Sequence, residues 1–265
     1  MRKVVDSNYL QSDKLHKYLS NPKNKVILTD QVSCEAIGSD LCRSFEILSQ
    51  YPKQVVVLNR TQNILSMSLK SKGLLKRIVC LNDTKNFRRL SNKISNGKLR
   101  DENFNFQVAQ MKNEATEELK QIRNGAEKMS ESIIRYFSSV TKQEARILRS
   151  GPPYNSDALS IIIKNIEEMT ISMFSKKVNF TRSRNYIEFY NSYLFRSGVC
   201  GYFLFQDWFL AGGLKDVKAK TMMNDLLDAQ IAAYATYFDG LLSHDKKIQR
   251  VYEISNYFIH EIKNA

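Results

Sequence analysis

Cysteine and histidine are scarce in this chain of 265 residues, which contains four cysteines and three histidines. No two cysteines are spaced as Cys-x-x-Cys, so the sequence indicates neither a structural zinc site nor a disulfide framework. This usage is typical of a reducing compartment. His16, His244 and His260 are scattered and indicate no catalytic triad. Phosphate-cradling motifs of the G-x-x-x-x-G-K and G-x-G-x-x-G types are also absent.

Long hydrophobic runs are missing as well. The most apolar stretch, residues 199–214, contains Asp207 and is too short to span a bilayer comfortably, so we interpret it as a buried helix. The N-terminal sequence MRKVVDSNYL is charged and continues into a strand-like run, unlike a signal peptide. Internal repeats and low-complexity tracts are not evident. We therefore expect a soluble, cytoplasmic protein with no membrane partner.

Acidic residues are few relative to basic ones. The chain has 27 Asp and Glu against 40 Lys and Arg, which gives a formal net charge of +13 and a pI near 9.5. Such an excess attracts polyanions, with nucleic acid ahead of an anionic membrane. A basic surface that only keeps the protein soluble is the alternative.

Two stretches concentrate the basic residues. Residues 76–100 carry a net charge of +7, and Asp83 is the single acid among them. Their basic residues are Lys76, Arg77, Lys85, Arg88, Arg89, Lys93, Lys98 and Arg100. The second stretch comprises Lys176, Lys177, Arg182 and Arg184, with Phe180 and Tyr186 among them. Basic side chains bind phosphates, and aromatic rings stack on unpaired bases. Both stretches are therefore candidate nucleic-acid contacts. The alternative is that each is a charged face exposed to solvent.

The chain divides by character into residues 1–75, 76–214 and 215–265. Strand-like runs occur at 3–5, 25–29, 54–58 and 241–242, and helix-like segments occur at 10–19, 31–48 and 221–238. Asp30 is the expected N-cap of the second of these helices. Strands that alternate with helices predict an α/β fold with a parallel sheet covered on both faces.

The middle region, 76–214, is predicted to be almost entirely helical. Apolar residues from Ala115 to Val140 recur every three or four positions, the pattern of a long helix that packs against another helix. Gly125 lies within this pattern and weakens the helix there. A Gly-Pro-Pro sequence at 151–153 ends the segment, and a new helix is expected from about Ser156.

Acidic residues stand at the ends of strand-like runs and near the starts of helices. Asp6 follows the first run, Asp245 follows the last one, and Glu35 lies near the start of the helix after the second run. Asp225 and Asp228 are expected in the first turns of the helix before the last run, where the helix dipole favours ionised carboxylates. Ligand sites form at the carboxyl ends of parallel strands, although an Asp after a strand is more often a turn residue or an N-cap.

The order and local sequence of these acids resemble those of the PIN-like nuclease family. Val4-Val5-Asp6-Ser7-Asn8 is similar to the family's opening, an apolar strand that ends in Asp before a small polar pair. Ser33-Cys34-Glu35-Ala36 resembles its second element. The segment 228–233 (DAQIAA) resembles its Asp-x-x-Ile-Ala-Ala helix start, and 238–245 (FDGLLSHD) resembles its closing strand with Thr/Ser-x-Asp.

The resemblance implies a PIN-like (Rossmann-like) parallel sheet flanked by helices and built from residues 1–75 and 215–265. Residues 76–214 would then be a large all-helical insertion, because the family has a much shorter segment between its second and third acids. It also implies phosphodiester hydrolysis without a covalent protein intermediate. The implied metal ligands are Asp6, Glu35, Asp228 and Asp245, with Asp225 assisting or replacing Asp228, and Ser243 orienting a ligand or a phosphate oxygen.

Carboxylates that converge without an opposite charge raise one another's pKa values, and a divalent cation removes this repulsion. Oxygen ligands without Cys or His favour Mg²⁺ or Mn²⁺ over zinc. We therefore expect an endonuclease that depends on one of these ions and cleaves RNA in preference to DNA. Because the family includes toxins of toxin–antitoxin modules, the resemblance also implies a bacterial toxin or defence effector, with an antitoxin or regulatory protein as partner.

Two other classes of protein fit parts of this pattern. A non-catalytic nucleic-acid-binding or adaptor protein on the same scaffold would keep the basic surfaces and need no metal. A wholly helical interaction protein would use the long apolar pattern of 115–140 to form a homo-oligomer.

Overall fold

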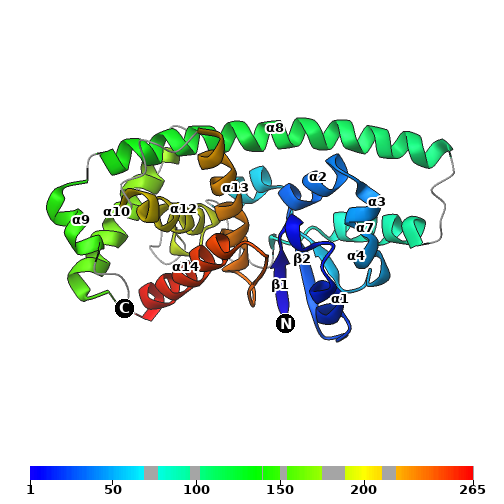
Figure 1. Ribbon diagram of the computed structural model, residues 1–265, viewed down its shortest axis with the longest axis horizontal. Helices are drawn as coiled ribbons and strands as arrows, with labels where there is room; N and C mark the ends of the chain where they lie inside the picture. The colour runs from blue at the N-terminus through cyan, green and yellow to red at the C-terminus, as the bar shows by residue number, and fades with distance from the viewer. Residues whose placement is uncertain are drawn as a thin grey trace. The chain divides into compact units, whose positions relative to one another are not determined.

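The computed structural model describes residues 1–68, 77–95, 102–138, 140–149, 154–174, 189–210 and 219–264 (Figure 1). The chain forms two compact units. The first, called here the α/β unit, comprises Met1–Ile122 and Tyr234–Gln249; the second, the helical unit, comprises Arg123–Ala233 and Arg250–Ala265. These bounds differ from the division drawn at 75/76 and 214/215, because periodicity indicates a helix without indicating what the helix packs against.

Within the described residues, the strands of the α/β unit form one parallel sheet. They are β1 (Arg2–Val5), β2 (Lys25–Leu28), β3 (Val55–Val57) and β4 (Leu241–Leu242), in the order β3-β2-β1-β4. Val4 of β1 pairs with Ile27 of β2 on one side and with Leu241 of β4 on the other. The predicted α/β class and parallel sheet are thus confirmed. Because every strand runs the same way, all four carboxyl ends lie at one edge of the sheet.

Helices of the α/β unit surround these strands (Figure 1). They are η1 (Ser7–Tyr9), α1 (Asp13–Leu19), α2 (Asp30–Gly38), α3 (Leu41–Ser44), α4 (Glu46–Gln50), α5 (Thr61–Ser68), α7 (Leu81–Ser95) and the first part of α8 (Glu102–Ser138). Their apolar sides, with the buried strands, form the core of this unit.

Capping residues place the helix starts differently from the prediction. The helix predicted over 31–48 is three separate helices, because the side chain of Asp40 accepts a hydrogen bond from the Arg43 N–H (3.1 Å) and begins a new one. Thr29, rather than Asp30, caps α2. Asp30 is instead the first residue of the helix, which leaves its carboxylate available for other contacts.

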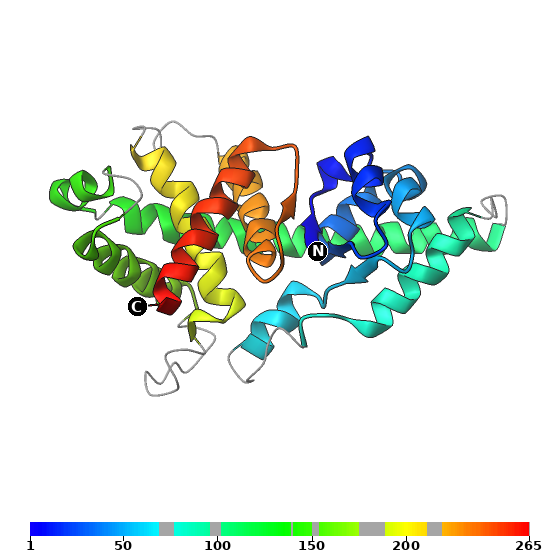
Figure 2. The same cartoon turned by 90° about the horizontal axis from the view of Figure 1, so that it is seen from below.

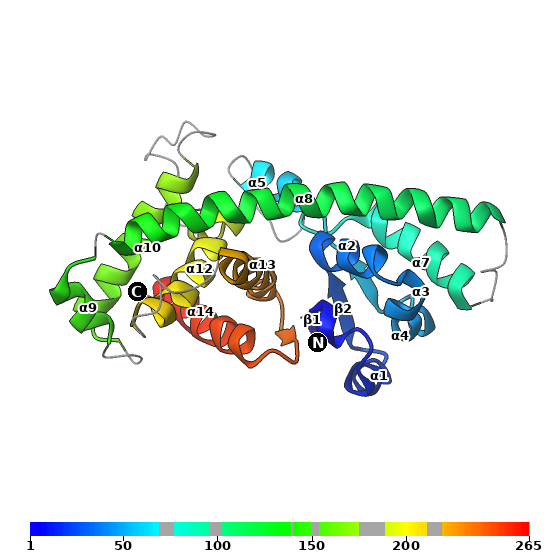
Figure 3. The same cartoon turned by 45° about the horizontal axis from the view of Figure 1, so that its top comes forward.

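Helix α7 packs on the sheet, although its residues fall in the region predicted as an insertion. The Val57 N–H of β3 donates to Thr84 Oγ1 of α7 at 3.0 Å. The first part of α8 lies beside α7 (Figures 2 and 3), and Lys93 Nζ donates to Gln107 Oε1 at 2.8 Å. A large share of the basic stretch 76–100 is therefore anchored to the sheet rather than to the helical unit.

The helical unit contains the rest of α8, α9 (Lys142–Leu148), α10 (Ser156–Phe174), α12 (Tyr193–Leu210) and most of α13 (Ala219–Ala235) and α14 (Lys246–Asn264). The predicted long helix is confirmed as α8, and Gly125 does not interrupt it. The Phe203 ring of α12 lies 5.3 Å from that of Phe258 in α14, and Phe137 of α8 lies 5.4 Å from Tyr202. Helix α12 is buried, as predicted for 199–214, whose last four residues lie outside the described ranges.

Helices α10 and α12 approach each other closely at Gly198. A Cβ atom at this position would overlap with the hydroxyl oxygen of Thr170, a fully buried residue of α10. The absence of a side chain at Gly198 therefore sets the distance between these two helices.

Replacing Gly198 with Ala should lower the free energy of unfolding by about 1–3 kcal/mol, because the added methyl group forces α10 and α12 apart. Urea unfolding followed by circular dichroism measures this. Gly125→Ala in α8 is the matched control. A Cβ atom at position 125 would meet no atom within 4 Å, so this substitution should stabilise the helix by about 1 kcal/mol. A Gly198→Ala protein as stable as the control would contradict the close approach, and adding Thr170→Ala should restore part of the loss.

Candidate functional site

Asp6 and Ser243 lie side by side at the carboxyl ends of β1 and β4. These strands pair in parallel through Val5 and Leu242, and the Asp6 N–H continues the ladder by donating to the Leu242 carbonyl at 2.9 Å. Ser243 Oγ donates to Asp6 Oδ2 at 2.6 Å. In an open parallel sheet, ligands bind where the strand order reverses, and here that point falls between β1 and β4.

Two further residues meet the Ser243 hydroxyl. The backbone N–H of Asp245 donates to Ser243 Oγ at 3.0 Å, and the side-chain Nδ2 of Asn8 donates to it at 3.3 Å. Asn8 Oδ1 in turn accepts the His244 N–H at 3.0 Å. We call Asp6, Asn8, Ser243 and Asp245 the switch-point cluster. Asn8 was not among the predicted site residues, and its only signal in the sequence is the small polar pair that follows Asp6.

Burial makes the charge on Asp6 costly. Only 4% of this residue is exposed, and burial is the largest effect that raises the pKa of its carboxyl above the ordinary value. Hydrogen bonds from Ser243 and from the backbone of Ser7 and Asn8 lower the pKa, while the nearby charge of Asp245 raises it. The balance is a raised pKa, and a bound cation would oppose it.

Asp245 also has a structural role. Its Oδ1 accepts the N–H of Lys247 at 2.7 Å and that of Ile248 at 3.4 Å, in the first turn of α14. This is the N-cap interaction that a strand-end Asp most often makes. Capping fixes the position of the Asp245 carboxylate, which is half-buried and close enough to Asp6 for its charge to raise the pKa of that residue.

The other predicted acids lie elsewhere. Glu35 is half-buried on α2, and its Oε1 accepts from Gln31 Nε2 at 3.2 Å. Asp225 and Asp228 lie on α13 in the helical unit. Among the residues that the structure describes, no three His, Cys, Asp or Glu side chains are grouped closely enough to share a metal ion. The structure therefore brings together Asp6, Ser243 and Asp245 from the predicted set.

Asp225 and Asp228 lie further into their helix than the dipole argument requires. Helix α13 already begins at Ala219, and no acid lies in its first turn. The field of the helix dipole falls off within that turn, so it does not favour ionisation of these two carboxylates.

Asp30 forms a second buried acidic site at the same edge of the sheet, after β2. It accepts the Thr61 N–H at Oδ2 (2.6 Å) and the Thr61 hydroxyl at Oδ1 (2.8 Å). The Thr61 hydroxyl also lies 2.8 Å from that of Tyr234. Burial raises the pKa of Asp30, and these hydrogen bonds oppose the shift. The sequence pattern predicts Asp30 as an N-cap, although this residue stands just after a strand, as Asp6 does.

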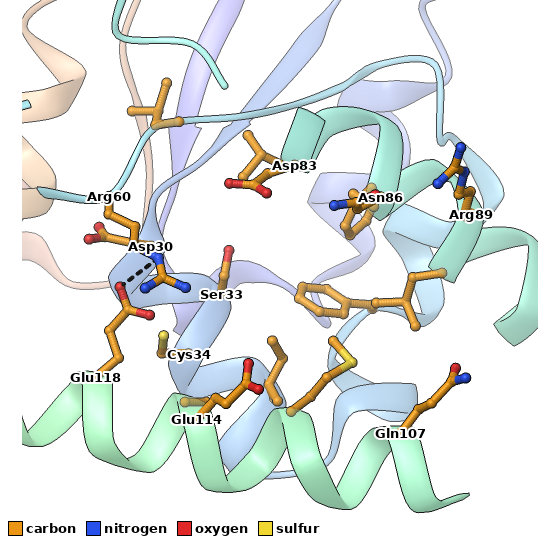
Figure 4. Close-up of a pocket in the computed structure, with 18 of the residues that line it drawn as sticks. Asp30, Ser33, Cys34, Arg60, Asp83, Asn86, Arg89, Gln107, Glu114 and Glu118 are labelled. Atoms are coloured by element: carbon orange, nitrogen blue, oxygen red, sulfur yellow. Dashed lines mark ion pairs between the residues drawn. The ribbon is translucent and has the colours of Figure 1, made fainter. Parts of the chain in front are cut away.

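A cavity of about 480 Å³ opens next to Asp30 (Figure 4). It lies between α2, the end of β3, α7 and the first part of α8, entirely within the α/β unit. Glu118 of α8 forms an ion pair with Arg60 at 3.5 Å inside this region. Sequence periodicity gave no indication of it, because the cavity depends on how α7 and α8 pack.

The predicted nucleic-acid contacts are only partly described. Arg77, Arg88 and Arg89 are exposed, and Arg89 borders the cavity. Lys76, Lys176, Lys177, Arg182 and Arg184 lie outside the described residues, as do Lys98 and Arg100. The described basic residues are thus available to solvent on the α/β unit.

No protein-family model matches the chain, and comparisons with curated proteins and with solved structures give no match. None of the described helices is long and apolar enough to cross a membrane. Function must therefore be inferred from the chemistry of the site itself.

The raised pKa of Asp6 should make stability depend on pH. The folded chain holds this proton more tightly than the unfolded chain, whose Asp titrates near 3.8. The proton therefore stabilises the folded chain fully below pH 3.8, the unfolded pKa. This stabilisation is lost as the pH rises through the pKa of Asp6 in the folded chain. Asp6→Asn carries no such charge, so in EDTA its stability relative to wild type should increase from pH 4 to pH 7. Urea unfolding at each pH measures this. Exposed Asp13→Asn is the control, and a flat difference for Asp6→Asn would contradict the assignment.

Proposed function

We propose that this protein is a metal-dependent endonuclease that hydrolyses phosphodiester bonds, with RNA preferred over DNA. One observation carries the proposal: where β1 and β4 meet, Ser243 Oγ donates to the Asp6 carboxylate and accepts the backbone N–H of Asp245, whose charge in turn raises the pKa of Asp6. Asp6 and Asp245 are the first and fourth acids of the PIN-like resemblance, and they come from opposite ends of the sequence.

The chemistry of the switch-point cluster fits Mg²⁺ or Mn²⁺. Magnesium keeps several waters and is held by one or two carboxylates together with substrate phosphates, so Asp6 and Asp245 are a sufficient protein contribution. The effects that raise the Asp6 pKa are burial first and then the neighbouring carboxylate of Asp245. A divalent cation would supply a positive charge that opposes both. Glu35, on α2 of the same unit, stays a proposed additional ligand.

Each residue of the cluster has a definite task in this proposal. A bound ion would lower the pKa of a water molecule and stabilise charge on the transferring phosphoryl group. Asp6 and Asp245 would hold the ion, and Ser243 would fix the Asp6 carboxylate by donating to Oδ2. Asn8 would position Ser243 through its amide and the backbone of His244 through its carbonyl. None of these tasks requires a covalent intermediate on the protein.

The charge of the chain supports a nucleic-acid substrate. The formal net charge of +13 attracts polyanions, and Arg77, Arg88 and Arg89 are exposed on the unit that carries the cluster. By analogy with the family that the sequence resembles, we propose a toxin or defence effector, controlled by an antitoxin or another regulatory protein.

A non-catalytic nucleic-acid-binding or adaptor protein is the second candidate. It is favoured by the capping of α14 by Asp245, which gives this acid a structural task that needs no metal. On this interpretation, the switch-point cluster only links β1 to β4. The two candidates differ in whether RNA is cut after it is bound.

Labelled RNA and single-stranded DNA should be cleaved with Mg²⁺ or Mn²⁺ and left intact in EDTA, with RNA cut faster. Asp6→Asn should reduce cleavage to background because one metal ligand loses its charge, while Asp13→Asn should cleave like wild type. Gel electrophoresis measures cleavage, and fluorescence anisotropy measures binding of the same RNA. Binding without metal-dependent cleavage by wild type would support the non-catalytic candidate; equal cleavage by Asp6→Asn would reject the proposed site.

Replacing Ser243 with Ala should reduce cleavage by about 10- to 100-fold, the usual effect of losing a residue that orients a metal ligand. The Mg²⁺ concentration for half-maximal cleavage should rise, because the Asp6 carboxylate is no longer held. Ser243→Thr keeps the hydroxyl and should recover much of the activity. A Ser243→Ala protein with unchanged magnesium dependence would show that this hydroxyl does not position the ion.

A further inference from the structure

The cavity beside Asp30 has the size and position of a substrate pocket. Its volume of about 480 Å³ falls in the range of small-molecule sites. Asp30 follows β2, the strand next to β1, so the cavity and the switch-point cluster stand at the same edge of one sheet. A strand of RNA bound at the cluster would pass this edge.

Aromatic side chains line the cavity. Phe45, Phe87 and Phe104 are nearly fully buried, and the Phe45 and Phe87 rings meet edge to face with centroids 5.3 Å apart. Phe104 also has Lys93 Nζ 5.5 Å from its ring centroid. The phenylalanines give the cavity an apolar wall against which a flat ring, such as an unpaired RNA base, can pack.

The polar part of the cavity is rich in hydrogen-bond acceptors. Glu114 and Glu118 project from α8, one turn apart, while Asp83 projects from α7 on the opposite side (Figure 4). Carboxylates at this spacing on one helix repel each other. Both oxygens of the neighbouring Asp30 are already occupied by Thr61. Glu118 already meets Arg60 and the Cys34 thiol, and Glu114 accepts from Gln110, so a ligand with N–H donors would share these carboxylates with them.

Basic side chains stand at the same cavity. Arg60 is 64% exposed and pairs with Glu118, and Arg89 is exposed on α7. Arg89 can reach the phosphate of a ligand whose ring packs against the phenylalanines, while Arg60 stays paired with Glu118. A ring with N–H donors that is attached to a phosphate is a nucleotide.

We propose that this cavity binds an unpaired guanine of the RNA substrate, with Glu118 as the residue that recognises the base. Guanine is the RNA base whose Watson–Crick edge has a ring N–H next to an amino group. A carboxylate is an acceptor with two oxygens and can pair with both groups at once. Adenine and cytosine place an acceptor beside the amino group, and uracil flanks its N–H with carbonyls. The inference rests on the proposed nuclease function, because it names the nucleotide that the same edge of the sheet selects.

The test is binding of 5′-mononucleotides to the full chain in EDTA, measured by isothermal titration calorimetry. GMP should bind about 10-fold or more tightly than UMP or AMP, the discrimination expected of one bidentate pair, with IMP between because it lacks the amino group. Inorganic phosphate and spermidine are the other probes. The proposal would be overturned if inorganic phosphate bound as tightly as GMP, if spermidine were the one probe that bound, or if no nucleotide bound.

Glu118→Gln should remove the preference for GMP over UMP, since an amide places a donor where the carboxylate had an acceptor. Glu117→Gln is the matched control, because Glu117 is exposed on the same helix and does not line the cavity. Thermal unfolding of both variants checks folding. An unchanged preference in Glu118→Gln, or the same loss in Glu117→Gln, would contradict the role of Glu118.

The two proposals fail separately. Asp6→Asn should bind GMP like wild type, since Asp6 does not line the cavity. If wild type cleaves RNA but shows no preference for GMP, the cavity assignment fails and the nuclease stands. If GMP binds selectively and no RNA is cut, the base-binding pocket stands and the nuclease fails.

Discussion

The pairing of β1 with β4 joins two parts of the chain that are far apart in sequence. Val4 and Val5 align with Leu241 and Leu242, and the backbone hydrogen bonds of this ladder continue through Asp6. Since β4 has only two residues, the ladder alone is short, and the Ser243–Asp6 hydrogen bond extends it with side chains. The switch-point cluster exists because this pairing fixes which residues stand next to each other at the edge of the sheet.

The same edge holds buried carboxylates whose charges are costly. Asp6 and Asp30 follow neighbouring strands, and burial raises the pKa of both. Their surroundings differ in a way that suggests different tasks. Asp30 has both oxygens hydrogen-bonded to Thr61, which is a stable internal arrangement. Asp6 has a second carboxylate beside it, Asp245, and this repulsion is what a divalent cation would relieve.

The apolar patterns predicted elements well because each reflects a local period. The β-branched run at 54–58 contains β3, and α8 covers most of the apolar pattern of 115–140, although it begins earlier, at Glu102. Predictions failed where a single side chain ends or starts an element. Asp40 begins a new helix inside the segment predicted as one, and α13 starts early enough to leave Asp225 outside its first turn. Such boundaries depend on individual hydrogen bonds, which periodicity does not contain.

Local features of the sequence were enough to predict the parallel α/β class, the positions of the strands, and Asp6, Ser243 and Asp245 as candidate partners, because strand-end acids and apolar periods are local. Which of the predicted acids meet depends on the folded chain. The tertiary structure joined Asp6 to Asp245 through Ser243, added Asn8, and left Glu35 outside any described group of three ligands. The cavity between α2, β3, α7 and α8 likewise depends on how these elements pack. Distances between residues that are remote in sequence follow from how helices and strands pack, and no local pattern fixes that packing.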